Sequence, residues 1–171
     1  MAAATGVEVP EKPDERYVKD MFDRFAESFD KVLTNLEYNA PQQIQSIVED
    51  LHQHTDPQTL SIVDAGCGTG LCGHYLKPLA SQLIGVDLSP GMLHRAKYRD
   101  QYDELIEQDL NEYFRQVSNK CDLIESADTL CYFGNLLDFL QLSYKALTAG
   151  GCIIFTAERH DGETITAYCL Q

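Results

Sequence analysis

The spacing of hydrophobic positions divides this chain of 171 residues into a helical N-terminal part and a longer part with a mixed pattern. Residues 14–33 and 44–51 carry apolar side chains every three or four positions, which predicts helices with one apolar face. Further along, apolar runs alternate with helical patterns, and five of these runs are predicted strands: 60–64, 83–87, 104–110, 121–128 and 152–157. Strands that alternate with helices predict an α/β fold with a parallel sheet and helices on both faces.

The same pattern indicates where the parts of the chain begin and end. Residues 1–13 are small, polar and proline-bearing, and we expect them to form a disordered tail. Residues 14–55 hold the N-terminal helices, residues 56–160 the α/β core, and residues 161–171 a C-terminal extension. Apolar residues alternate with others over 163–170, which predicts one short extended segment there.

The net charge of the chain limits the kinds of partner that it is expected to bind. The formal net charge of −14 argues against nucleic acid or an anionic membrane, because binding to phosphates needs clustered Lys and Arg. No apolar run approaches the roughly 18 residues of a membrane span, and the N-terminus lacks the apolar core of a secretory signal. We therefore expect a cytoplasmic protein with no membrane partner.

The six cysteines are expected to be reduced thiols, most of them packed as small apolar residues. Cys67, Cys72 and His74 lie close together, but they lack the spacing of a zinc knuckle and a fourth ligand nearby. No metal site is predicted.

Residues 60–70, with the sequence LSIVDAGCGTG, carry the strongest chemical signal. A predicted strand ends at Asp64 and runs into a loop with glycine at every second position, where a ligand can approach the backbone closely. A dinucleotide fingerprint, G-x-G-x-x-G, would need glycine where this chain has Leu71, and the third glycine is instead Gly70. A nicotinamide-dependent oxidoreductase is therefore the less favoured alternative.

The next predicted strand ends at Asp87, about 20 residues after the first glycine of the loop. An acidic residue in this place lies at the tip of the second strand and can accept hydrogen bonds from ribose hydroxyls. Ser89 and Pro90 follow, and these residues suit the N-cap and the first position of a helix.

These two stretches resemble the first and second motifs of class I S-adenosylmethionine (SAM)-dependent methyltransferases, and the chain is identified as a member of that family. Residues 64–70 match the pattern [DE]-x-G-x-G-x-G, and residues 85–93, GVDLSPGML, match the second motif. The closer resemblance, over about residues 17–170, is to the methyltransferase domain of bacterial proteins that also carry tetratricopeptide repeats. The resemblance implies a Rossmann-like three-layer sandwich with a mostly parallel sheet, SAM as cofactor and S-adenosylhomocysteine (SAH) as product.

The resemblance also implies which residues bind the cofactor. In the family, Asp87 would hold the ribose, Leu88 and Met92 would flank the adenine, and Asp109 would meet the adenine amino group. Residues 22–30, FDRFAESFD, resemble the helix that covers the cofactor in many members, so Phe25 and Phe29 are included. The implied cofactor-binding residues are Asp64, Gly66, Cys67, Gly68, Gly70, Asp87, Leu88, Met92, Gln108, Asp109, Leu110, Ser126, Ala127, Phe25 and Phe29. Two plainer interpretations stay open: Asp109 as a helix cap, and the phenylalanines as packing residues.

The predicted activity is transfer of the SAM methyl group to a small-molecule acceptor by in-line displacement. Such a reaction needs mostly positioning, and a base only when the acceptor is protonated. Glu158, His160 and Asp161 follow the fifth strand and are candidates for that base, but the sequence assigns no catalytic residue and no acceptor. A SAM-binding protein or scaffold without catalysis is the alternative.

The end of the chain leads to a further expectation. The family's sheet has seven strands in the order 3-2-1-4-5-7-6, whereas the pattern here becomes weak after the fifth, so the fold is expected to be truncated there. Residues 152–157 would then form an exposed sheet edge with unpaired backbone groups. We expect self-association through that edge and weak catalysis by this chain alone.

Overall fold

The computed structural model describes residues 14–52, 56, 58–157 and 166–170. Its centre is a six-stranded sheet in the order β3-β2-β1-β4-β5-β6. The strands are β1 (Leu60–Ala65), β2 (Ala80–Asp87), β3 (Glu104–Glu107), β4 (Cys121–Ser126), β5 (Leu147–Ala157) and β6 (Thr166–Leu170). The first five strands pair in parallel and β6 is antiparallel to β5, which confirms the predicted mostly parallel sheet.

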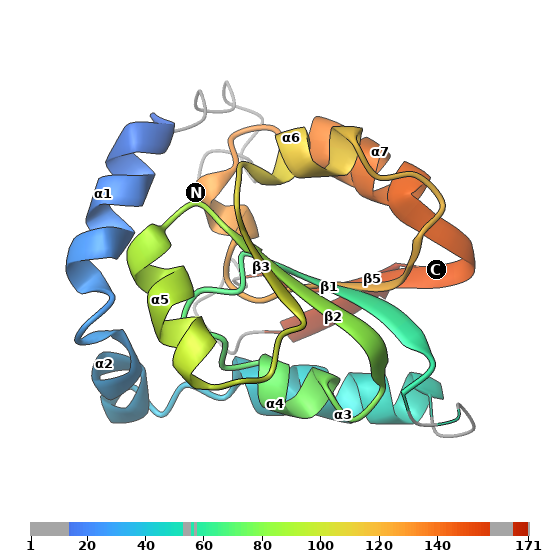
Figure 1. Ribbon diagram of the computed structural model, residues 1–171, viewed down its shortest axis with the longest axis horizontal. Coiled ribbons are helices and arrows are strands. Elements are labelled where there is room, and N and C mark those ends of the chain that lie inside the picture. The colour runs from blue at the N-terminus through green and yellow to red at the C-terminus, as the bar shows by residue number, and fades with distance from the viewer. Residues whose placement is uncertain (1–13, 53–55, 57, 158–165, 171) are drawn as a thin grey trace.

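Helices cover both faces of this sheet, as Figure 1 shows. The helices α6 (Leu110–Arg115) and α7 (Leu137–Ala146) lie on one face, and α3 (Ala40–His52) and α4 (Gly73–Leu76) lie on the other. Near the glycine loop, α1 (Glu15–Phe25) and α2 (Phe29–Asn35) lie beside α5 (Pro90–Tyr98). A short 3₁₀ helix, η2, spans Leu130–Tyr132. The fold is the predicted three-layer sandwich.

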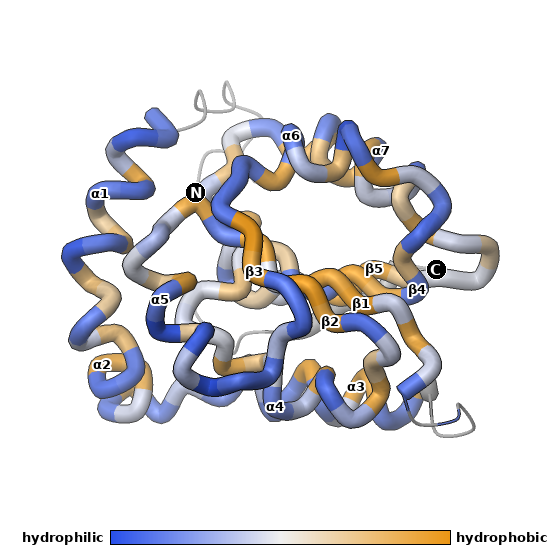
Figure 2. The backbone as a smooth tube through the Cα atoms, in the orientation of Figure 1, coloured by the Kyte–Doolittle hydropathy of each residue, from blue (hydrophilic) through white to orange (hydrophobic). Residues whose placement is uncertain are grey.

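The sheet separates two hydrophobic cores. Consecutive residues of β1 serve different cores, since Val63 packs with Phe114 and Phe139, whereas Ile62 packs with Ile44 of α3. A strand that is buried on both faces needs apolar side chains at nearly every position. This explains the continuous apolar runs of the sequence, which appear as the orange strand segments in the middle of Figure 2.

The expected caps also form. The Ser89 hydroxyl accepts a hydrogen bond from the Met92 backbone N–H at 3.1 Å, with Pro90 in the first turn of α5. The Asp109 carboxylate accepts from the Glu112 N–H at 3.1 Å and caps α6. These caps begin both helices directly after β2 and β3, at the sheet edge where the glycine loop lies.

Several elements differ from the predicted pattern. A turn at residues 26–28 divides the expected helix 14–33 into α1 and α2, and this change of direction brings Asp30 against Thr69 and Arg99. The strand β3 ends earlier than predicted, at Glu107, because Asp109 already caps α6. The strand β4 also ends earlier, at Ser126, and β5 begins earlier, at Leu147.

The prediction of an exposed sheet edge at the fifth strand is wrong. Residues Thr166–Leu170 pair antiparallel with Ile153–Ala157, so β6 covers the side of β5 that was expected to be free. The predicted extended segment is thus confirmed within 166–170, and the sheet does not stop at the fifth strand. The argument for self-association through the β5 edge no longer holds. Residues 1–13 lie outside the described part, and the four-part division of the chain stays a prediction.

The core allows a stability prediction. Phe139 is fully buried and its ring lies 5.9 Å from Phe114 and 5.2 Å from Phe133, centroid to centroid. Phe139→Ala should lower the free energy of unfolding by about 3–5 kcal/mol, because it leaves a cavity between α7 and the sheet. Leu137→Ala, on the same helix but 55% exposed, is the control and should cost less than about 1 kcal/mol in urea unfolding. Equal losses would contradict the described packing.

Candidate functional site

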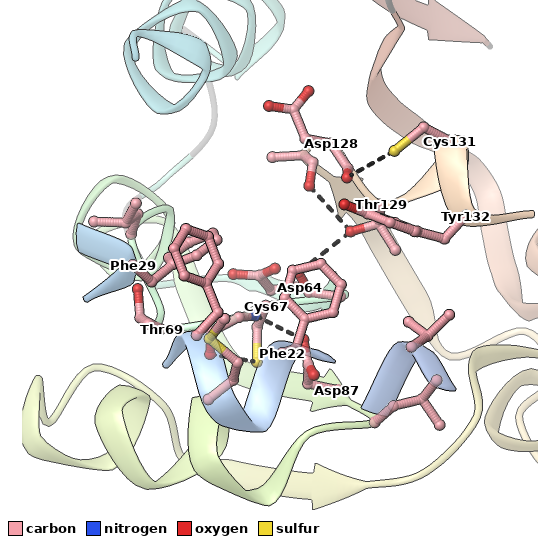
Figure 3. A pocket seen from close by; sticks show the side chains of 18 of the residues that line it. Phe22, Phe29, Asp64, Cys67, Thr69, Asp87, Asp128, Thr129, Cys131 and Tyr132 are labelled. Carbon is pink, nitrogen blue, oxygen red and sulfur yellow. Dashed lines mark hydrogen bonds between the residues drawn. The ribbon is translucent and has the colours of Figure 1, made fainter. Parts of the chain in front are cut away.

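A cavity of about 540 Å³ lies beyond the carboxyl ends of the first four strands, with α1 and α2 on its other side. Figure 3 shows side chains from these elements around it. In a parallel sheet with helices on both faces, this edge is where ligands bind, because strand ends and helix N-termini meet there. The position of the cavity therefore marks the candidate site.

The glycine loop forms the wall next to β1. All three of its glycines have positive φ, +83° at Gly66, +51° at Gly68 and +82° at Gly70. A Cβ on Gly66 would lie 2.1 Å from the Thr129 Oγ1, and one on Gly70 would lie 2.9 Å from the Tyr102 ring. A Cβ on Gly68 would meet no atom within 4 Å. Gly66 and Gly70 thus permit packing, whereas Gly68 leaves open space in the cavity wall.

The Asp87 carboxylate connects the glycine loop to the next helix. One oxygen accepts a hydrogen bond from the Gly68 N–H at 2.9 Å, and the other accepts from the Ser89 N–H at 2.8 Å. Burial raises the pKa of Asp87, while these backbone donors act in the opposite direction. Asp87 lines the cavity beside Leu88 and Met92.

Most of the residues that the sequence indicated meet at this cavity. Its lining includes the following twelve: Phe25, Phe29, Asp64, Gly66, Cys67, Gly68, Asp87, Leu88, Met92, Asp109, Leu110 and Ala127. Asp109 both caps α6 and lines the cavity, so its two interpretations are compatible.

Three indicated residues do not line the cavity. Gly70 packs against Tyr102, and the Ser126 hydroxyl donates to the Ala65 carbonyl at 2.8 Å, which joins the ends of β4 and β1. Gln108 contributes its backbone N–H to the Asp87 carbonyl at 3.1 Å. Each of them supports the wall from behind. Glu158, His160 and Asp161 lie outside the described residues.

Two aspartates of the N-terminal helices were missed. Asp23 accepts hydrogen bonds from the Ser89 hydroxyl at 2.5 Å and the Gly91 N–H at 2.9 Å. Asp30 accepts from the Thr69 hydroxyl at 2.6 Å and from the Arg99 guanidinium at 2.6 Å. They attach α1 and α2 to α5 and the glycine loop. Each of them follows a phenylalanine in the stretch FDRFAESFD. This repeated Phe-Asp pair is the feature of the sequence that could have indicated both aspartates.

Aromatic rings cover the cavity on the side of these helices. Phe22 lies 6.4 Å from Phe29 and 5.1 Å from Tyr132, and Phe25 lies 5.3 Å from Phe29, all edge-to-face between ring centroids. The sequence pointed to Phe25 and Phe29 but not to Phe22 and Tyr132. Tyr132 belongs to η2, whose position next to α1 only the fold determines.

A buried pair of carboxyl groups joins Asp64, which lines the cavity, to Glu125, which is not among the lining residues. Asp64 and Glu125 are neighbours across β1 and β4, at 2% and 0% exposure. The Tyr102 hydroxyl donates to Asp64 at 2.6 Å, and the Cys72 thiol donates to Glu125 at 3.7 Å. Burial raises the pKa of Asp64 to about 6, and burial together with the Asp64 charge raises the pKa of Glu125 well above its usual range. The pair therefore holds a proton at neutral pH.

The described thiols and carboxylates of the site do not indicate a nucleophilic cysteine or a metal site. Burial raises the pKa of Cys67 and of Cys72 well above the ordinary thiol range, so neither is a thiolate nucleophile. Within the described ranges, no three His, Cys, Asp or Glu side chains are grouped so that they could hold a metal ion. No helix in the described part is both long and apolar enough to cross a membrane.

A comparison with protein-family models matches residues 63–155 to the family described as "Methyltransferase domain". The matched range covers β1 to most of β5, and so includes the glycine loop and Asp87.

Known relatives match over most of this chain. It is 30% identical over 131 residues to malonyl-[acyl-carrier protein] O-methyltransferase of Salmonella typhimurium, covering 77% of this chain and 52% of that one. It is also 30% identical over 121 residues to the 18S rRNA (guanine-N(7))-methyltransferase of Bos taurus, covering 64% and 43%. The chain thus spans about half the length of the curated relatives it matches.

A solved structure agrees in fold. Magnesium protoporphyrin IX methyltransferase from Synechocystis PCC 6803, with bound SAH, has a TM-score of 0.69 at 20% identity, over 86% of this chain and 73% of that one. The association with tetratricopeptide repeats stays a prediction, because neither the family model nor these proteins carry that name.

The buried pair generates a prediction about pH. The folded protein keeps protons on Asp64 and Glu125 at pH values where the unfolded chain has lost them, so stability falls as pH rises above about 4. Each retained proton costs about 1.4 kcal/mol per pH unit in that window. Glu125→Gln removes the more strongly shifted group, so the variant should lose less stability than the wild type between pH 6 and pH 8.

Urea unfolding at several pH values measures this difference. The control is Glu112→Gln, which changes an exposed glutamate of α6 and should run parallel to the wild type. Parallel curves for Glu125→Gln and the wild type would show that the pair does not retain a proton.

Proposed function

Because the chain belongs to the class I SAM-dependent methyltransferase family, we propose that its cavity binds SAM and that the protein transfers the methyl group to a small-molecule acceptor. The observation that carries this proposal is the arrangement of Gly68 and Asp87. The glycine leaves open space next to a carboxylate held by two backbone N–H groups. A ligand with a diol could donate to the Asp87 carboxylate, and an extended chain on that ligand could lie in the open space at Gly68.

In the proposed complex, the Asp87 carboxylate accepts from the ribose hydroxyls. Leu88, Met92 and Leu110 offer apolar surface to the adenine, and Asp109, at the start of α6, accepts from its amino group. The methionine part would lie along the glycine loop toward Ala127. SAM, when bound, supplies a methyl group on a sulfonium sulfur. The chain's own part is to fix donor and acceptor in line and to exclude water.

The acceptor is proposed to be a small molecule because the cavity is bounded by α1 and α2 and lined mainly by apolar and aromatic side chains. The relatives named above act, by their names, on malonyl-[acyl-carrier protein], on 18S rRNA and on magnesium protoporphyrin IX. The exclusion of nucleic acid that we drew from net charge is weakened, because one relative is named as an 18S rRNA methyltransferase. A cytoplasmic location stays a prediction.

Calorimetry with SAM, SAH and NAD tests the cofactor. We expect one molecule of SAM or SAH to bind per chain and no heat with NAD. Transfer of tritium from methyl-labelled SAM to a panel of small molecules then tests catalysis. Binding of NAD in preference to SAH would overturn the proposal, and SAH binding without any transfer would favour a non-catalytic SAM-binding protein.

Asp87→Asn tests the ribose contact. The change keeps the shape of the side chain but removes its charge and one acceptor, and hydrogen bonds to charged groups are worth about 1.5–3 kcal/mol. The dissociation constant for SAH should rise roughly tenfold or more. Asp122→Asn is the control, since Asp122 also accepts from a backbone N–H, that of Ser61, but outside the cavity. Unchanged affinity in a folded Asp87→Asn protein would contradict the assignment.

Gly68→Ala tests the glycine wall. The new methyl group would enter the open space and hinder the cofactor, so SAH affinity should fall at least tenfold. Gly150→Ala introduces the same kind of change, at φ +85° and with no atom within 4 Å, but away from the cavity. Both variants should lose about 1–2 kcal/mol of stability from the left-handed backbone. Only Gly68→Ala should lose SAH binding, and an equal effect of both would sink the assignment.

A further inference from the structure

The cavity lining includes four residues that the cofactor assignment does not use. Three of them are Asp128 and Tyr132, from the segment after β4, and Phe22, from α1, all labelled in Figure 3. The fourth is Tyr38, from the connection between α2 and α3. We call this group of four residues the acceptor end.

Asp128 is held in a specific position. Its φ is +49°, in the left-handed region that Asp adopts more readily than most residues with a side chain. Its N–H donates to the Thr156 Oγ1 at 2.7 Å, and the Thr156 hydroxyl donates back to the Asp128 carboxylate at 2.6 Å. Thr156 is buried in β5, so the sheet itself fixes this carboxylate.

The Tyr38 phenol lies near the same carboxylate and interacts with its charge. Burial, and then the Asp128 charge, raise the pKa of Tyr38, so the phenol keeps its proton and acts as a donor. The Thr156 hydroxyl therefore orients the Asp128 carboxylate, and the Tyr38 phenol interacts with its charge. A carboxylate fixed in this way has remaining lone pairs for a ligand.

The charged and aromatic side chains of the cavity lining select the ligand. Phe22 and Tyr132 lie edge-to-face, 5.1 Å apart, and aromatic rings attract cations. None of the described cavity residues is Lys, Arg or His, whereas five are acidic: Glu15, Asp64, Asp87, Asp109 and Asp128. An anionic acceptor would meet like charges there. A cation would meet a carboxylate and aromatic rings.

We propose that the acceptor is a primary or secondary amine on an apolar body, and that Asp128 binds its ammonium group and takes its proton. This inference rests on the proposed methyl transfer and adds the class of acceptor and a catalytic residue. Asp128 removes one proton from the ammonium, which leaves a neutral amine with a free electron pair. That pair forms the new N–C bond, while the S–C bond breaks and its electrons stay on sulfur. The product is a methylated ammonium, and Asp128 passes its proton to water.

Three probes with the same apolar body test the proposal: 2-phenylethylamine, 2-phenylethanol and 3-phenylpropanoic acid. Each is added to the full chain with labelled SAM, and its binding to the SAH complex is measured by calorimetry. We expect the amine to bind and to be methylated, and the acid and alcohol to do neither. Preference for the acid or the alcohol overturns the inference, as does the absence of selective amine binding.

Variants separate this inference from the proposed function. Asp128→Asn should lower kcat/KM for the amine at least 100-fold, the range of general-base catalysis, and leave the SAH dissociation constant within about threefold. Tyr38→Phe keeps the carboxylate and should lower kcat more than it raises KM. Asp122→Asn is again the control. Failure of the wild type to bind SAH would defeat methyl transfer itself, whereas SAH binding with full activity in Asp128→Asn would defeat only the role of Asp128.

Discussion

The hydrogen bonds of Asp87 are the interaction on which the candidate site depends. A single carboxylate at the end of β2 accepts from the Gly68 N–H and from the Ser89 N–H. It thereby fixes the glycine loop after β1 and the start of α5 relative to each other. The parallel register between β1 and β2 brings the two strand ends to the same edge of the sheet. This register alone places Asp87 next to the glycine loop. A ligand that bound Asp87 would meet a wall that is already in place.

The N-terminal helices depend on this arrangement in turn. Asp23 reaches the cap of α5 and Asp30 reaches Thr69 of the glycine loop, so α1 and α2 are attached through polar contacts to the parts that Asp87 holds together. Their phenylalanines then close the cavity with apolar surface. The aspartates attach the two helices to the site, and the phenylalanine rings cover the cavity, as expected for helices that lie over a bound ligand.

Three carboxyl residues near the cavity reduce the stability of the folded protein instead of contributing to it. Asp64 and Glu125 are buried side by side in the centre of the sheet, and Asp128 occupies a left-handed backbone position. Buried carboxyl groups and left-handed residues with a side chain each reduce stability, and proteins retain buried carboxyl groups mostly at functional sites. All three residues lie at the carboxyl ends of β1 and β4, next to the same cavity.

The sequence by itself determined the strands of the sheet, the caps at Ser89 and Asp109, and the glycine loop with its following acid, because these features depend on local spacing and on residues close in the chain. Ten of the twelve indicated residues that line the cavity lie at or after strand ends, which parallel strands place together, whereas Phe25 and Phe29 come from α1 and α2. Tertiary structure decided the rest. The cover of β5 by residues 166–170, the contacts of Asp23 and Asp30, and the pairing of Glu125 with Asp64 join positions far apart in sequence. The alternation of apolar and polar residues reports which face a side chain takes, but not which distant backbone or carboxylate it will meet there.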